Sequence, residues 1–280
     1  MVRVSRIVIF PFKSFDGVEV DQVRVLPAGG LEHDRRFVLI TADGRVVNGK
    51  RTDRVHQLVI VYDRRTRSVD LSRRDRPTDP VKFHLDGDRE ELELWLSEYF
   101  ETPVAIVENA DSGFPDDTVA FGPTFITTET LRTVASWFAE MTLDEARRRF
   151  RANIELEGEE VGEIGSSATS NGSNAPFWED RFFATSAEVV RFRVGTVCFE
   201  GTNPCARCVV PMRDSISGKF NAEFRAIFKR QREATLPAWA NRSRFDHFYR
   251  LAVNSRPVLP LTGTTIRTGD RVDILETVRC

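Results

Sequence analysis

The chain has 280 residues, of which 41% are hydrophobic, so it can bury an ordinary core without help from disulfides or metal ions. Its four cysteines are too few for the dense framework of a small secreted domain, and the net charge of −2 provides no overall field to attract nucleic acid. The N-terminus lacks a signal-peptide pattern, and no stretch reaches membrane-spanning length. We therefore expect a reduced, cytoplasmic protein with neither nucleic acid nor membrane as a partner.

The first hundred residues are mainly strand-like. Apolar and polar residues alternate in short runs rich in β-branched residues, which favours a small sheet or barrel. The predicted strands are 3–10, 18–26, 36–41, 55–63 and 67–72. A helix is predicted over 89–100, where Leu92, Trp95, Leu96 and Tyr99 recur at helical spacing and form one apolar stripe.

The helices are more frequent after a strand-like stretch at 102–109. One is predicted at 128–140, and a second follows Thr142, which has Glu145 at the spacing of a capping box. Residues 158–176 are rich in Gly, Ser and Asn and predict a mobile surface loop. Alternation resumes at 188–201, and a helix at 222–234 and a closing strand at 265–275 complete the pattern.

Cys205 and Cys208 form a C-x-x-C pair in "NPCARCVV". A structural zinc site needs a second pair of ligands, and the scattered histidines supply it only if His247 converges in space. A redox dithiol needs the pair at the start of a helix, whereas Pro211 and Gly218 predict a strand and a turn after it. Plain buried thiols are the default for isolated cysteines, but Arg207 stands directly beside Cys208, and a guanidinium favours a thiolate that can act as a nucleophile or metal ligand.

Several blocks resemble one family in order and approximate spacing. "PCARC" precedes Asp214 and Gly218, and it is flanked by "RFRANIELEG", "WEDRF" and "TIRTGDRVDIL". These blocks resemble the MOSC domain of molybdenum cofactor proteins. Upstream, "FPFKSFDGVEV", "LEHDRRFVLI" and "GRVVNGKRTDRV" are similar to the β-barrel domain that precedes MOSC in the mitochondrial amidoxime reducing component and its bacterial relatives.

The resemblance implies a mainly β (α+β) fold with two domains. Residues 1–102 are expected to form a small N-terminal MOSC-associated β-barrel domain, and residues 103–280 a MOSC β-barrel flanked by helices. The implied cofactor is the molybdenum cofactor (molybdopterin), whose metal is bound by one cysteine thiolate. The match falls on Cys208, a soft ligand of the kind that such a metal prefers.

An anionic cofactor that carries a phosphate also needs cationic and hydrogen-bonding groups around it. By resemblance these are Lys13, Ser14, Arg35, Thr128, Arg151, Arg207 and Tyr249, with Cys208 as the catalytic residue and metal ligand. Several positions keep a second interpretation. Arg36 competes with Arg35, Thr127 and Thr128 could cap the following helix, Phe248 rivals Tyr249, and Arg147 to Arg149 fit surface charges of a helix.

The resemblance further implies an oxidoreductase that reduces small N-hydroxylated compounds such as hydroxylamines, amidoximes and N-hydroxylated bases. No cysteine-rich iron–sulfur segment follows, so a separate electron donor of ferredoxin, flavodoxin or cytochrome type is expected. "VVPM" after the cysteine and Ala152 after the arginine depart from the family pattern and put the substrate in question. The alternative function is a non-catalytic carrier of the cofactor, or of persulfide sulfur on Cys208, because MOSC domains also occur fused to pyridoxal-phosphate-dependent desulfurases. A third hypothesis is a degenerate family member that binds nothing.

Overall fold

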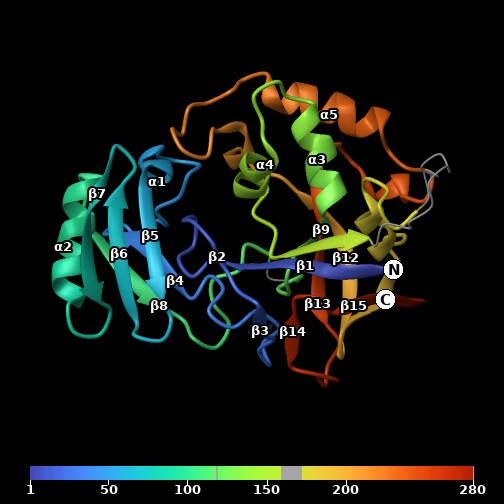
Figure 1. Cartoon of the computed structure of the whole chain (residues 1–280), viewed down its shortest axis with the longest axis horizontal. Coiled ribbons are helices and arrows are strands. Elements are labelled where there is room, and N and C mark those ends of the chain that lie inside the picture. The colour runs from blue at the N-terminus through green and yellow to red at the C-terminus, as the bar shows by residue number, and fades with distance from the viewer. Residues whose placement is uncertain (118, 159–171, 280) are drawn as a thin grey trace.

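The computed structural model describes residues 1–117, 119–158 and 172–279. Within these ranges the protein is mainly β, with a closed barrel and flanking helices, which confirms the predicted fold class (Figure 1). The loop predicted at 158–176 falls largely outside the described residues. In the described part of the chain, no helix combines the length and the apolar character needed to cross a membrane.

The larger part of the molecule is the closed β-barrel, to which the described residues contribute seven strands. Each strand pairs with the next, and β10 pairs back with β1 to close the ring. Phenylalanine rings fill the interior; the rings of Phe182 and Phe192 stack with centroids 4.0 Å apart, and Phe125 meets Phe192 edge-on. In ring order the strands are β10 (Ile154–Gly158), β9 (Phe125–Thr127), β13 (Arg250–Pro257), β12 (Val197–Ala206), β11 (Glu188–Val194), β15 (Arg271–Arg279) and β1 (Val2–Ile9).

The N-terminal end of the chain is built into this barrel. β1 pairs with both β10 and β15, β2 (Val18–Glu19) extends β1, and β3 (Gln22–Arg24) pairs with β14 (Thr265–Arg267). Two predicted strands are therefore each divided: 18–26 into β2 and β3, and 265–275 into β14 and β15, which a turn at Gly269 with φ of +88° separates. The boundary between residues 102 and 103 stays a prediction.

The remaining strands form a second lobe with its own core, at the end of the molecule away from the two termini (Figure 1). Helix α2 (Arg89–Phe100) forms where predicted and buries Leu92, Leu96 and Phe100. The prediction of strand at 55–57 is wrong: Arg54 donates to the carbonyl of Tyr99 in α2 (2.5 Å), and the chain makes the helical turn α1 (Arg54–Gln57) before the strand begins. The strands of this lobe are β4 (Phe37–Thr41), β5 (Leu58–Asp63), β6 (Ser68–Arg73), β7 (Arg76–His84) and β8 (Val104–Glu108).

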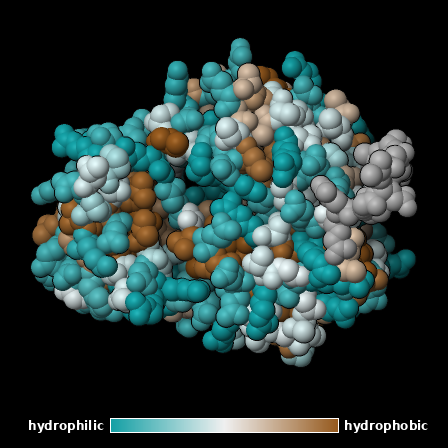
Figure 2. Space-filling view, viewed as in Figure 1, coloured by the Kyte–Doolittle hydropathy of each residue, from teal (hydrophilic) through white to brown (hydrophobic). Residues whose placement is uncertain are grey.

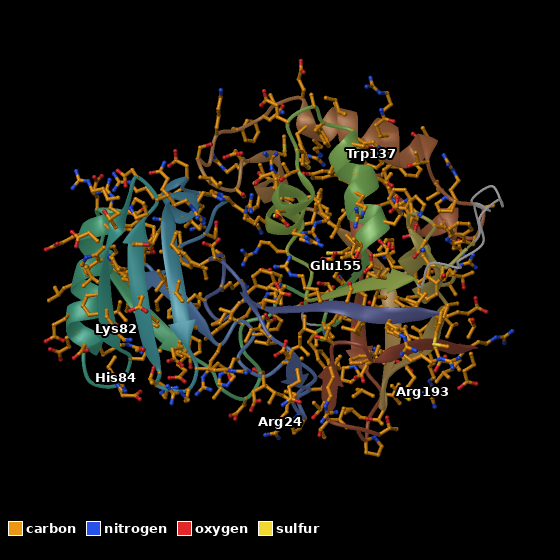
Figure 3. The ribbon with its side chains drawn as sticks, viewed as in Figure 1. Arg24, Lys82, His84, Trp137, Glu155 and Arg193 are labelled. Atoms are coloured by element: carbon orange, nitrogen blue, oxygen red, sulfur yellow. The ribbon has the colours of Figure 1, made fainter. Side chains whose placement is uncertain are left out.

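Three helices cover one side of the barrel: α3 (Thr128–Ser136), α4 (Leu143–Phe150) and α5 (Phe224–Ala234) (Figure 1). Trp137, just after α3, packs edge-on against Phe228 of α5 with centroids 5.3 Å apart (Figure 3). The predicted helix 128–140 ends early because the backbone tightens, with the amides of Trp137 and Phe138 donating three residues back. Short 3-10 helices lie at η1 (Trp178–Phe182), η2 (Val210–Met212) and η3 (Arg242–Arg244).

Candidate functional site

A cavity of about 860 Å³ lies between the second lobe and the helical side of the barrel, and Figure 2 shows this face hollowed between the two parts. Its size is sufficient for a cofactor-sized ligand. It is lined by side chains from the loop after β1, the segment before β4, the end of α4 and the loop after β12. Six residues predicted from sequence come together here: Lys13, Ser14, Arg35, Arg151, Arg207 and Cys208.

Cys208 lies two residues beyond the end of β12, at the wall of the cavity. Its side chain is exposed, and its sulfur accepts a hydrogen bond from the amide of Val210 (3.5 Å). The strand predicted after it is wrong, because the short helix η2 begins at Val210 instead, with Pro211 in its first turn. The thiol is therefore neither packed in the apolar core nor remote from the cationic groups.

Arg207 turns its guanidinium toward the other cysteine of the pair. Its Nη1 donates to Sγ of Cys205 (3.2 Å), and its Nη2 donates to the carbonyl of Phe150 at the end of α4 (2.5 Å). The sequence placed this charge beside Cys208, but in the folded chain its sulfur contact is Cys205. Since Cys205 also lines the cavity, two sulfurs face the same space, one of them held by an arginine.

Arg151 carries a guanidinium that forms no ion pair with a residue that the structure describes, although the carboxylates of Asp16, Asp34 and Asp116 act on it at longer range. It caps the C-terminal end of α4 with φ of 51°, and its only described partner is the ring of Phe10, 4.2 Å from the guanidinium carbon. Burial, together with repulsion from Arg35, lowers the pKa of Arg151 to about 10. An anion bound in the cavity would supply the missing countercharge.

Arg35 is held in place by Asp34 and Asn153, two residues that the sequence analysis did not single out. It forms an ion pair with Asp34, whose other oxygen accepts from the amides of Phe10 (2.7 Å) and Asn153 (Nδ2, 3.1 Å). Burial alone would lower the pKa of Arg35, but the carboxylates of Asp34 and Asp116 raise it. Arg36 instead pairs with Glu108 (2.6 Å), so Arg35 is the one of the two arginines that lines the cavity.

Lys13 and Ser14, in the loop after β1, also line the cavity. The ammonium of Lys13 contacts the carboxylate of Asp116 (2.9 Å) and donates to the carbonyl of Phe114 (3.0 Å). Ser14 adopts φ of 81°, which is unusual for a residue other than glycine and marks a tightly held turn. Asp116 gave no signal in the sequence, because its partner Lys13 lies about a hundred residues away.

Two predicted site residues do not line this cavity. Thr128 is buried and donates to Glu155 (2.8 Å), while the neighbouring Thr127 caps α3 by accepting from the amide of Thr130. Tyr249 is 1% exposed and packs edge-on against Phe228; burial raises its pKa, and its hydroxyl has no described hydrogen-bond partner.

Of the three arginines of α4 that the sequence suggested as surface charges, Arg148 is exposed, whereas Arg147 and Arg149 are partly buried in ion pairs. Arg147 makes a bidentate ion pair with buried Glu155 (2.7 and 2.9 Å), which lies beside α4 near the middle of the molecule (Figure 3). Arg149, with its side chain 11% exposed, pairs with buried Glu145 (2.5 Å). The pair with Glu155 holds α4 against β10, and Arg149 also contacts Asp214 in the loop after η2 (3.5 Å). These contacts fix the position of Arg151 at the end of α4.

The described residues contain no group of three or more His, Cys, Asp or Glu side chains arranged to hold a metal ion. His247, the candidate for a zinc site with the C-x-x-C pair, is not among the residues that line the cavity. A metal here would therefore have to bring most of its own ligands and take one thiolate from the protein. The donor set and the surrounding cations fit a metal held by an anionic organic cofactor.

Comparison with known proteins identifies the N-terminal part of the chain. Residues 1–103 match the family model described as the MOSC N-terminal beta barrel domain. Residues 1–103 are a MOSC N-terminal beta barrel domain. Proteins with MOSC domains are associated with binding of the molybdenum cofactor.

No curated protein matches the chain. Among solved structures, it is similar to the YuaD protein from Bacillus subtilis, with 11% sequence identity and a TM-score of 0.39, over 97% of this chain and 94% of that one. A likeness of this size says nothing about the activity of either protein.

Proposed function

We propose that this protein binds the molybdenum cofactor in the 860 Å³ cavity and reduces N-hydroxylated compounds with electrons from a separate donor. The observation that carries the proposal is Arg151, a partly buried guanidinium that forms no ion pair with a described residue and lines the same cavity as the exposed thiol of Cys208. An unpaired buried charge is costly, and sites that keep one do so for a ligand of opposite charge.

Each residue of the cavity has a role in holding such a cofactor. Cys208 offers the thiolate, and Arg151, Arg35 and Lys13 supply positive charge for the anionic part. Asp34 orients Arg35, and Cys205 together with the carbonyl of Phe150 orients Arg207. Thr128 and Tyr249 would not contact a ligand in the cavity. They support its walls, Thr128 at the start of α3 and Tyr249 by packing against α5.

The overall reaction is a two-electron reduction. The N–O bond of the N-hydroxylated compound breaks, two electrons and two protons are consumed, and the products are the amine and water. The cofactor, when bound, supplies the redox chemistry. The protein orients it, limits access of water through the walls of the cavity and places the substrate against it.

The test begins with molybdenum content. We expect protein co-expressed with the cofactor pathway to contain molybdenum, Cys198→Ser to retain it, and Cys208→Ser to lose it while keeping the same thermal unfolding midpoint. Cys198 is the matched control because it is a free cysteine in β12 that does not line the cavity. If Cys208→Ser binds as much metal as the wild type, the assignment of the ligand is wrong.

Activity then separates the enzyme from its alternative. Turnover of benzamidoxime with reduced methyl viologen, lost in Cys208→Ser, supports a reductase. Tight molybdenum without turnover, or persulfide sulfur on Cys208 detected by mass spectrometry, supports the carrier instead. Absence of molybdenum from every preparation rules out both cofactor functions.

A further inference from the structure

An exposed apolar and cationic surface adjoins the cavity, and most of its residues lie outside the site described above. It consists of the turn at residues 213–220 and the outer face of α5. Ile216 and Phe220 are 48% and 47% exposed on this turn, and the guanidinium of Arg213 lies over the ring of Phe220, 5.7 Å from its centroid. We name it the 213–230 surface. Exposed apolar side chains rimmed by charges are typical of protein-binding sites.

The charge of this surface is opposite to that of the whole chain. Residues 213–230 include five basic and two acidic side chains, whereas the chain carries a net charge of −2. Lys219, Arg225, Lys229 and Arg230 are exposed, and none of them forms an ion pair with a residue that the structure describes. Their field is therefore uncompensated and attracts a negatively charged partner.

The turn is rigid, so it can present its apolar side chains without an ordering cost. Asp214 accepts from the amides of Ile216 (3.2 Å) and Ser217 (2.8 Å), and the amide of Ser215 donates to buried Glu145 of α4 (2.9 Å). Gly218 adopts φ of +71° against Asp53, and a Cβ there would lie 2.7 Å from that side chain. Figure 1 shows the segment between β12 and α5 reaching toward α1.

The surface is continuous with the wall that carries the sulfurs. Arg213 and Ser215 line the cavity together with Cys208. Arg225 of α5 lies over the ring of Tyr249 (5.3 Å), and the backbone of Tyr249 accepts a hydrogen bond from the amide of Arg207 (3.0 Å). A partner docked on this surface is thus brought against the mouth of the cavity.

We propose that the 213–230 surface is the docking site for an acidic electron-transfer protein, an inference that rests on the proposed function. The chemistry requires it to deliver two electrons per turnover. Two molecules of a reduced flavodoxin each give up one electron, two protons come from water, and the substrate N–O bond breaks to give amine and water. A second copy of this chain does not fit the surface, because two identical cationic faces repel each other.

The test measures binding of reduced and oxidised flavodoxin by calorimetry at low salt. Lys219→Gln combined with Lys229→Gln, and separately Phe220→Ser, should each weaken binding about tenfold, and the charge variant should also flatten its dependence on ionic strength. The matched controls are Arg64→Gln combined with Arg65→Gln for charge and Leu94→Ser for apolar exposure, since these residues are exposed on the other lobe. Controls should bind as the wild type does.

Three results would overturn the proposal: flavodoxin does not bind, the surface variants bind as tightly as the wild type, or the controls weaken binding equally. Tighter binding of a short single-stranded RNA with the same dependence on Lys219 and Lys229 would overturn it too. Turnover with reduced methyl viologen distinguishes failure of the reductase proposal from failure of the docking proposal. This turnover should be the same in the surface variants as in the wild type. If the wild type shows none, the reductase activity is rejected, whereas the measured binding of flavodoxin still stands.

Discussion

At the scale of single residues, the cavity combines paired and unpaired positive charge. Arg35 and Lys13 each contact a carboxylate, whereas the only contact of the Arg151 guanidinium within the described residues is the face of Phe10. A cation over an aromatic ring is stabilised by much less than a hydrogen-bonded ion pair. Arg151 is therefore the residue most dependent on an anion that binds from solution.

Replacing Arg151 by Met should weaken binding of inorganic phosphate to the cofactor-free protein by about tenfold, because a charge-assisted contact is lost. It should lower molybdenum retention in the co-expressed protein as well. Isothermal titration measures the first effect and metal analysis the second. Arg64→Met removes an exposed charge far from the cavity and should change neither. Unchanged phosphate affinity in Arg151→Met would remove the main support for an anionic ligand.

A second residue with unusual electrostatics lies away from the cavity. Glu179 in η1 is 1% exposed. Its Oε2 accepts from the hydroxyls of Thr127 and Thr130 (both 2.9 Å), while its Oε1 has no hydrogen-bond partner in the part of the chain that the structure describes. Burial and the adjacent carboxylate of Asp180 raise the pKa of Glu179 to about 7. The folded protein therefore holds this proton more tightly than the unfolded chain does.

The consequence is a pH dependence of stability that one substitution should remove. Glu179 stabilises the fold fully below its unfolded pKa of about 4.5, and this contribution is lost as pH rises to about 7. Glu179→Gln, which stays neutral, should gain on the wild type by on the order of 2 kcal/mol between pH 5 and pH 8. Urea unfolding at the two pH values measures the difference. Parallel changes in both proteins would show that Glu179 does not titrate in this range.

At the scale of elements, α4 connects the fold to the site. Thr142 caps its first turn by accepting from the amide of Glu145 (3.1 Å), as the capping-box spacing predicts, but the carboxylate of Glu145 turns to Ser215, Arg148 and Arg149 instead of returning to the cap. The local half of the motif could be predicted from sequence. The other half could not, because its partner Ser215 is seventy residues away.

Thr142→Ala should therefore destabilise the protein by about 1 kcal/mol, the usual contribution of an N-cap. Thr142→Ser keeps the hydroxyl and should lie within a few tenths of a kcal/mol of the wild type. Thermal and urea unfolding provide the measurement. Equal losses in both variants would mean that the methyl group of Thr142, and not its hydrogen bond, stabilises the start of α4.

At the scale of the whole molecule, the sequence predicts what local patterns and ordered blocks encode. Three features could be predicted in this way: helix α2, the cap of α4 and the cationic residues that line the cavity with Cys208. The partners of these residues across the cavity could not be predicted, because contacts such as that of Lys13 with Asp116 depend on how distant segments pack. The sulfur partner of Arg207 could not be predicted either. Its guanidinium contacts Cys205 and not the adjacent Cys208, because neighbours in sequence can point to opposite sides of a loop.

The position of β1 has a consequence for the order in which the protein can fold. β1 is synthesised before both strands that it pairs with, β10 and β15, and in the second pair Val2 lies opposite Val272. The barrel therefore cannot close until β15 has been synthesised, and until then Val4 and Ile7, both buried in the complete fold, lack part of their packing. Long waits of this kind expose nascent chains to aggregation, so slower translation or chaperone binding during synthesis should favour the yield of this protein.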